Sequence, residues 1–299
     1  MGVGAGFVFV RQLERILSPP ALRGVLAPFI AARVAVKRTH PVLPLPECLG
    51  GGTFQISKGQ RRKNYLNTTL EFFPEKLGTP KWRGRLQILG VECLESARRE
   101  KRPVILAFCH FGPYFLMRCW LRAAGFPAAT LVEGQSQNRS LMKQLQDRVS
   151  PFPEIPIAFH RQDQLREAVA FVTAGNPLLV AIDILNGKQV NVPLDDHCQF
   201  GMASGAIRMA MRNGAELIPC SIIEIGAWRF QIQLGPPAPL ASGDPILIGK
   251  HLLDAMLPVL RRYPEQCTER LVKQFGRVDS EDVEIAKIDF RKESRNEWA

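Results

Sequence analysis

The stretch Val104-Ile105-Leu106-Ala107-Phe108-Cys109-His110-Phe111-Gly112-Pro113 decides the fold of this chain. Its first six residues are apolar, and a short apolar run bounded by turn signals is typical of a buried strand. Gly112-Pro113 then predicts a turn into a helix, because proline suits the first helical position. We therefore expect His110 at the carboxyl end of a buried strand, where open α/β sheets build their sites.

Histidine is the side chain best suited to exchange a proton near neutral pH, so His110 is a candidate catalytic base. A histidine at the end of a strand can also be a structural residue whose ring nitrogens are satisfied by hydrogen bonds. Position alone leaves the two interpretations balanced.

Outward from this strand, apolar runs alternate with helical patterns. The predicted strands are 103–109, 127–132, 155–159, 178–182, 190–194, 216–223 and 228–234, and the predicted helices are 21–36, 57–73, 80–100, 113–124, 138–148, 162–174, 203–213, 246–262 and 265–275. Such alternation predicts the α/β class, with a mostly parallel mixed sheet covered by helices and an N-terminal helical segment in front of it.

Three parts are expected along the chain. Pro41, Pro44, Pro46 and Gly50-Gly51-Gly52 indicate a linker, so residues 1–53 are expected to form an N-terminal helical segment and its connection. Residues 54–278 are expected to form the α/β domain. Residues 279–299 are charged and poor in large apolar groups, which predicts a loosely held tail.

The net charge of +11 and the pI near 9.6 call for an anionic partner. Nucleic acid is not expected, because basic clusters such as Arg61-Arg62-Lys63 are not interleaved with aromatic stacking residues. An acidic carrier protein and anionic lipid headgroups fit equally well. Residues 21–36 are apolar with Arg23 and Arg33 interspersed, which fits a helix on a membrane surface or one packed on the core.

The seven cysteines are scattered and show neither C-x-x-C pairs nor zinc spacing, so reduced thiols and no metal are expected. No apolar stretch reaches 18 residues, which argues against a transmembrane helix. The expected location is therefore the cytoplasm, with peripheral contact at the cytoplasmic face of the inner membrane. Phosphate-loop, dinucleotide-binding and α/β-hydrolase motifs are absent, and no cofactor is expected.

The segment around His110 resembles the first motif of the glycerolipid and lipid A acyltransferases, in which a strand delivers His-x-x-x-x-Asp/Glu. Further segments resemble the same family, in the same order, over about residues 60–275. These segments are Asn64–Leu66 with Phe72–Pro74, Leu89–Leu94, Asn138–Arg148, Asp183, Asn191–Pro193 with Gly201–Ala206, and Arg262–Gln266. Together they identify the chain as a member of the bacterial lipid A biosynthesis acyltransferase family, of the lauroyl/myristoyl type.

The resemblance implies that His110 is a general base. It implies transfer of an acyl group from an acyl-carrier-protein or CoA thioester to a hydroxyl or amine of a lipid or small-molecule acceptor, without metal or cofactor. Arg148 matches the family's active-site arginine and is expected to bind substrate, although it can equally be an ordinary helix-end residue.

The chain departs from the family at Phe115, which stands where the acidic residue that orients the imidazole is usual. We expect Phe115 to pack inside or to line an acyl pocket. Glu133, at the end of the next predicted strand, is the candidate catalytic replacement because both strand ends would open on one crevice. It can also be a helix-start residue favoured by the helix dipole. Asp183, expected to be structural or to contact substrate, is its main rival.

Two functions stay open at this point. The first is an acyltransferase whose acceptor is a lipid A precursor, a related lipid or a secondary metabolite. The second is a catalytically silent acyltransferase fold that binds acyl chains or a carrier protein.

Overall fold

The computed structural model describes residues 3–36, 42–133, 154–157, 162–184 and 188–277. Its central sheet has seven strands in the order β3 (Leu86–Leu89), β11 (Arg229–Leu234), β10 (Glu216–Gly226), β4 (Val104–Phe108), β7 (Leu178–Ala181), β5 (Ala129–Glu133) and β6 (Glu154–Ile157). Neighbouring strands run parallel except for the antiparallel pair β10–β11. The predicted α/β class with a mostly parallel mixed sheet is confirmed.

Strand β4 is buried on both faces, which explains why its sequence is a continuous apolar run rather than an alternating one. Ile105 and Ala107 belong to the core formed with α8 (Gln162–Thr173), α9 (Gly205–Asn213) and α10 (Pro245–Arg262). Leu106 and Phe108 belong to the opposite core, formed with α3 (Lys58–Thr68), α5 (Val91–Arg99) and α6 (Met117–Ala123).

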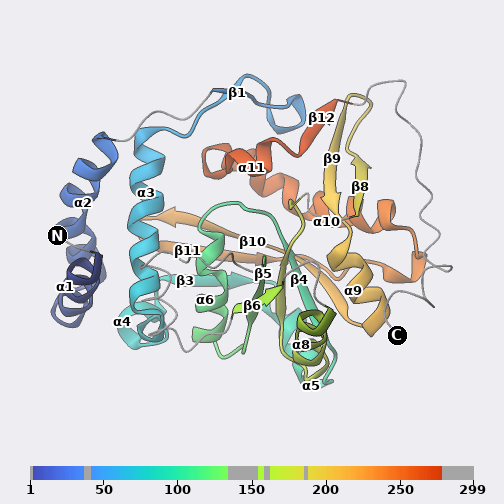
Figure 1. The fold of residues 1–299 in the computed structure, drawn as a ribbon, viewed down its shortest axis with the longest axis horizontal. Helices are drawn as coiled ribbons and strands as arrows, with labels where there is room; N and C mark the ends of the chain where they lie inside the picture. Colours follow the sequence, from blue (N-terminus) through green and yellow to red (C-terminus); the bar gives the residue numbers. More distant parts are fainter. Residues whose placement is uncertain (1–2, 37–41, 134–153, 158–161, 185–187, 278–299) are drawn as a thin grey trace.

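The N-terminal helices α1 (Val3–Ile16) and α2 (Pro19–Ala35) lie at one side of the molecule, next to α3 (Figure 1). Leu22 and Leu26 of α2 are buried against the second core. The helix predicted over 21–36 is confirmed, whereas α1 was not predicted.

A second sheet, antiparallel throughout, has the order β12 (Phe275–Arg277), β9 (Cys198–Ala203) and β8 (Gln189–Pro193). It attaches to the end of β7, where Ala203 donates its backbone N–H to the carbonyl of Ile182 at 2.8 Å. A small pair, β1 (Leu43–Pro44) and β2 (Thr53–Phe54), encloses η1 (Glu47–Leu49), whose Cys48 and Leu49 are buried in the first core. All seven cysteines are free.

Two predicted helices are wrong. The segment 80–100 is α4 (Pro80–Arg83), β3 and α5, because Gly90 takes a φ of +75° and packs so closely on Leu234 that a Cβ would lie 2.2 Å from its carbonyl oxygen. The segment 265–275 begins within η6 (Pro264–Gln266), continues as α11 (Glu269–Val272), and then pairs through Phe275 with β9. Strand β9 was missed. The predicted helix 138–148 and the tail 279–299 lie outside the described residues.

Candidate active site

The register of two central strands brings His110 and Asp183 together. In the parallel pair β4–β7, Phe108 lies opposite Ala181, and Ile182 donates its N–H to the carbonyl of Phe108 at 2.9 Å. His110 and Asp183 each follow their strand's last residue by two positions, so they meet at the carboxyl edge of the sheet. This edge is where open α/β sheets build their sites.

The carboxylate of Asp183 holds His110 through two hydrogen bonds. Its Oδ1 lies 2.8 Å from the imidazole Nδ1, and its Oδ2 accepts the backbone N–H of His110 at 2.9 Å. Asp183 is fully buried, whereas the His110 side chain keeps 13% of its surface exposed. A carboxylate on Nδ1 favours the tautomer with the proton on that nitrogen, which leaves the Nε2 lone pair free to accept a proton.

Aromatic rings pack around the imidazole. The ring of Tyr114 lies edge-on, 4.5 Å from the imidazole between centroids, and Phe108 lies 5.9 Å away. Burial raises the pKa of the Tyr114 hydroxyl, so it stays protonated at neutral pH. Phe115, in η4 (Tyr114–Leu116), contacts the ring of Tyr114 at 5.6 Å and is partly buried against the second core.

The turn after His110 depends on glycine. Gly112 has a φ of +58°, and a Cβ there would lie 2.1 Å from the carbonyl oxygen of Ile222 in β10. Only a residue without a side chain allows the turn to lie this close to the sheet.

Cys109, the immediate neighbour of His110, is not a candidate nucleophile. Its side chain points into the core on the α10 side, where Sγ lies 3.8 Å from the sulfur of Met256. Burial raises the pKa of this thiol well above its ordinary value, which suppresses the reactive thiolate.

Comparison with known proteins assigns the sequence to a family. Residues 68–279 match the family model described as bacterial lipid A biosynthesis acyltransferase. The chain belongs to this family. It is therefore an acyltransferase of lipid metabolism. The structure is similar to that of the 1-acyl-sn-glycerophosphate acyltransferase PlsC from Thermotoga maritima, with 13% sequence identity, a TM-score of 0.43, and coverage of 88% of this chain and 95% of that chain. No curated protein matches the sequence.

The carboxylate that contacts the imidazole comes from the end of β7, whereas position 115 holds a phenylalanine. Asp183, the rival of Glu133 for this role, contacts Nδ1 of the imidazole. The strand order explains this placement, because β7 lies next to β4, whereas β5, which carries Glu133, lies beyond β7. The side chain of Glu133 is outside the described residues, as is the whole of Arg148. Asp183 is fully buried, and its two carboxylate oxygens bond the ring and the backbone of His110.

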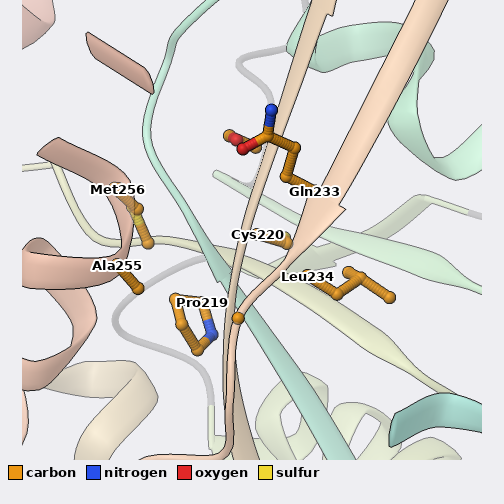
Figure 2. Close-up of a pocket in the computed structure, with 8 residues that line it drawn as sticks. Pro219, Cys220, Gln233, Leu234, Ala255 and Met256 are labelled. Carbon is orange, nitrogen blue, oxygen red and sulfur yellow. The ribbon is translucent and has the colours of Figure 1, made fainter. Parts of the chain in front are cut away.

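A small cavity lies near the site, between β10, the end of β11 and α10 (Figure 2). Its volume is about 90 Å³, and Pro219, Gly235 and Met256 are among the residues that line it. Cys220, which also lines the cavity, is the strand partner of Phe108. The cavity therefore lies beside the last residue of β4, and not beside His110.

Within the described ranges, no group of three or more His, Cys, Asp or Glu side chains is arranged to hold a metal ion. None of the helices in those ranges is long and apolar enough to cross a membrane.

Proposed function

We propose that the chain transfers an acyl group from an acyl-carrier-protein or CoA thioester to a hydroxyl or amine of a lipid or small-molecule acceptor, with His110 as general base. The observation that carries this proposal is the buried carboxylate of Asp183 on Nδ1, which leaves Nε2 to accept the acceptor's proton. It removes the difficulty raised by Phe115, because the imidazole has an acidic partner from another strand.

The step balances without a cofactor. Nε2 removes the proton from the acceptor hydroxyl or amine as its oxygen or nitrogen attacks the thioester carbonyl. The C–S bond then breaks, and the leaving thiolate takes the proton back from the imidazolium. Asp183 stabilises the positive charge on the ring between the two events, as carboxylates do in other His–carboxylate pairs. Backbone amides or Arg148 would stabilise the oxyanion.

We also propose that the protein works at the cytoplasmic face of the inner membrane, attached through α1 and α2. One side of α2 exposes the apolar residues Val25 and Phe29, and Val36 directly after the helix is exposed as well. Phe9 of α1 packs edge-on against Phe29. Arg33, in the last turn of α2, is exposed, and its guanidinium lies over the ring of Tyr65 in α3 at 5.2 Å. Arg23 faces inward instead and pairs with Glu224 at 2.7 Å, so it does not serve a lipid surface. An exposed apolar helix face with cationic residues is typical of interfacial helices.

The test is acyl transfer by the purified full chain, with labelled acyl-carrier-protein and acyl-CoA thioesters offered to lipid A precursors, lysophospholipids and free amines. Comparing the lipids and metabolites of cells with and without the gene would narrow the acceptors to be tried. His110→Ala should lower turnover about 10²–10⁴-fold, which is the usual contribution of a general base. His251→Ala is the matched control, because His251 lies on α10 and bonds only the carbonyl of Pro236 among the described residues.

Each outcome decides between the two functions. Product that depends on His110 supports the transferase. Wild-type turnover from folded His110→Ala rules out this base. Binding of acyl thioesters with no product from any acceptor supports the silent acyl-binding protein.

A further inference from the structure

We infer that Thr268 is a positioning residue that holds the backbone of His110 so that Nε2 faces the substrate. The inference rests on the proposed role of His110 as base. The hydroxyl of Thr268 donates a hydrogen bond to the carbonyl oxygen of His110 at 2.7 Å. The hydroxyl oxygen of Thr268 also accepts the N–H of Leu271 at 3.2 Å and thereby caps α11.

This contact matters because His110 lies beyond the last paired residue of its strand. The ladder between β4 and β7 ends at Phe108, so no strand partner fixes the His110 carbonyl. Asp183 holds the N–H and the ring on one side of the residue. Thr268 holds the carbonyl on the other. Together they fix the backbone of His110 at both its N–H and its carbonyl, and the ring between them.

The segment that carries Thr268 is itself firmly attached to the turn. Gly112 donates its N–H to the carbonyl of Gln266 at 2.9 Å, and Phe111 forms an antiparallel bridge with Cys267. Residues 266–268 therefore contact residues 110–112 of the turn one by one, in antiparallel order. Because its backbone is held in place by these contacts, the Thr268 hydroxyl can fix the orientation of the His110 carbonyl.

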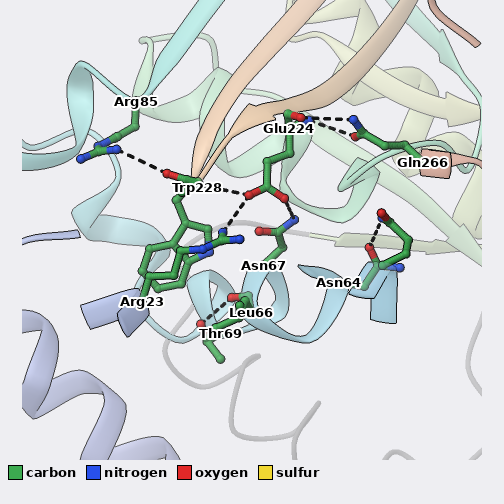
Figure 3. Close-up of polar contacts among 11 residues, drawn as sticks. Arg23, Asn64, Leu66, Asn67, Thr69, Arg85, Glu224, Trp228 and Gln266 are labelled. Atoms are coloured by element: carbon green, nitrogen blue, oxygen red, sulfur yellow. Dashed lines mark hydrogen bonds and ion pairs between the residues drawn. The ribbon is translucent and has the colours of Figure 1, made fainter. Parts of the chain in front are cut away.

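The side chain of Gln266 joins this segment to the sheet. Its Oε1 accepts the N–H of Glu224 at 3.0 Å, and its Nε2 donates to the Glu224 carbonyl at 3.2 Å (Figure 3). The Glu224 carboxylate is buried and accepts from Arg23 of α2 and from Asn67 of α3. The support for Thr268 thus extends into β10 and the N-terminal helices, and it includes charge-assisted bonds, which are the stronger kind.

The experiment compares Thr268→Val and Thr268→Ser in the full chain. Valine has nearly the same shape but no donor, and we expect kcat to fall about tenfold, the effect of losing one such hydrogen bond, with KM changed less than about twofold. Serine keeps the hydroxyl and should restore kcat to within about threefold of wild type. Thr268→Asp caps α11 at least as well but has no hydrogen to donate. It should fail like valine, and it carries the test if the valine variant does not fold.

Thr268→Val also removes the cap of α11, so Asp244→Ala serves as the control for losing a helix cap. Asp244 caps α10 through the N–H of Ile246 at 2.8 Å, at the start of an 18-residue helix remote from the turn. This variant should lose stability comparable to that lost by Thr268→Val and keep kcat. An equal fall of kcat in both variants, or wild-type kcat in Thr268→Val or Thr268→Asp, overturns the inference.

A second measurement does not depend on turnover. In protein labelled with ¹⁵N at its five histidines, the Nδ1–H of His110, assigned with His110→Ala, should give a downfield proton signal through its bond to Asp183. The signal should weaken or shift in Thr268→Val and return in Thr268→Ser. An unchanged signal in the valine variant contradicts the inference. If wild type transfers no acyl group, the proposed function fails, yet this signal still decides whether Thr268 positions the ring.

Discussion

At the scale of single residues, the two oxygens of Asp183 have different tasks: one binds the ring of His110 and the other binds its backbone N–H. Asp183→Asn keeps the size of the side chain but removes the charge that stabilises the imidazolium. We expect turnover to fall about 10²–10⁴-fold while the protein still folds. Kinetics together with thermal unfolding measure the two effects separately.

Glu133→Gln is the matched comparison for Asp183→Asn. Both changes neutralise a carboxylate at the carboxyl end of a neighbouring strand of one sheet, but only Asp183 is hydrogen-bonded to the imidazole in the described structure. The Asp183 variant should lose far more activity. A larger loss in Glu133→Gln would return the catalytic role to Glu133.

Gly112 provides a second prediction at this scale. Gly112→Ala places a methyl group 2.1 Å from the Ile222 carbonyl, so β10 or the turn must move. Gly214 has nearly the same φ, +59°, but nothing within 4 Å of its hypothetical Cβ. Strain from φ alone costs about 1–2 kcal/mol. Gly112→Ala should therefore destabilise clearly more than Gly214→Ala in urea unfolding, and it alone should reduce turnover. Equal losses would mean that close packing at the turn is unimportant.

At the scale of elements, α1 and α2 combine a buried face with an exposed apolar one. Phe29 is 62% exposed and Phe9 37%. Each phenylalanine that enters the interface should contribute about 1–2 kcal/mol. A Phe9→Ser/Phe29→Ser variant should therefore bind anionic phosphatidylglycerol vesicles at least about tenfold more weakly than wild type.

Sedimentation with vesicles measures this binding. Wild type should prefer anionic to neutral phosphatidylcholine vesicles and release in high salt, because the charge attraction is screened. Val42→Ser is the control, since Val42 is 58% exposed but lies outside both helices. Binding that is indifferent to the phenylalanines or to lipid charge would argue against this attachment.

Most elements with strong patterns could be predicted from the sequence, and the failures have local causes. Strand β4 is a continuous apolar run, and helix α10 repeats apolar residues at helical spacing over 18 residues. Strand β3 was hidden in a helical pattern because it is only four residues long and half-buried; its structure comes from pairing with β11, which lies about 140 residues farther along the chain. Pairing between strands so far apart in the sequence leaves no pattern in the few residues around each strand.

The site could be predicted only in part for the same reason. His110 was found because its strand and turn are contiguous in sequence. Its partner Asp183 lies 73 residues away, and choosing it over Glu133 required the order of strands in the sheet. Taking the next strand in sequence as the next in space gave β5, whereas the two most apolar strands, β4 and β7, lie together at the centre.

At the scale of the whole molecule, buried thiols make stability depend on alkaline pH. Burial raises the pKa of Cys267 from 9.0 to about 12. Below pH 9 the thiol is protonated in the folded and in the unfolded protein, and its contribution to the free energy of unfolding is fully present. Between pH 9 and 12 the thiol ionises only in the unfolded protein, so this contribution is lost as the pH rises. The loss is at most about 4 kcal/mol.

Urea unfolding from about pH 8 to 11 should show this fall in the free energy of unfolding. In Cys267→Ala the fall above pH 9 should be shallower than in wild type. Cys93→Ala, which removes a thiol that is only partly buried, should change the slope less. Parallel curves for wild type and Cys267→Ala would show that this thiol does not contribute.

The strand order also governs how the molecule can be synthesised. The central strand β4 has β7 and β10 as neighbours, and both follow it in the chain, with residue 216 pairing back to residue 104. While the polypeptide emerges, both edges of its most apolar strand stay unpaired until β7 is made about 70 residues later, and one edge until β10 is made about 110 residues later, roughly 5–20 s in all. Such edges invite pairing with other chains. Production of this protein should therefore depend on chaperones, and slower synthesis at low temperature should favour soluble product over aggregate.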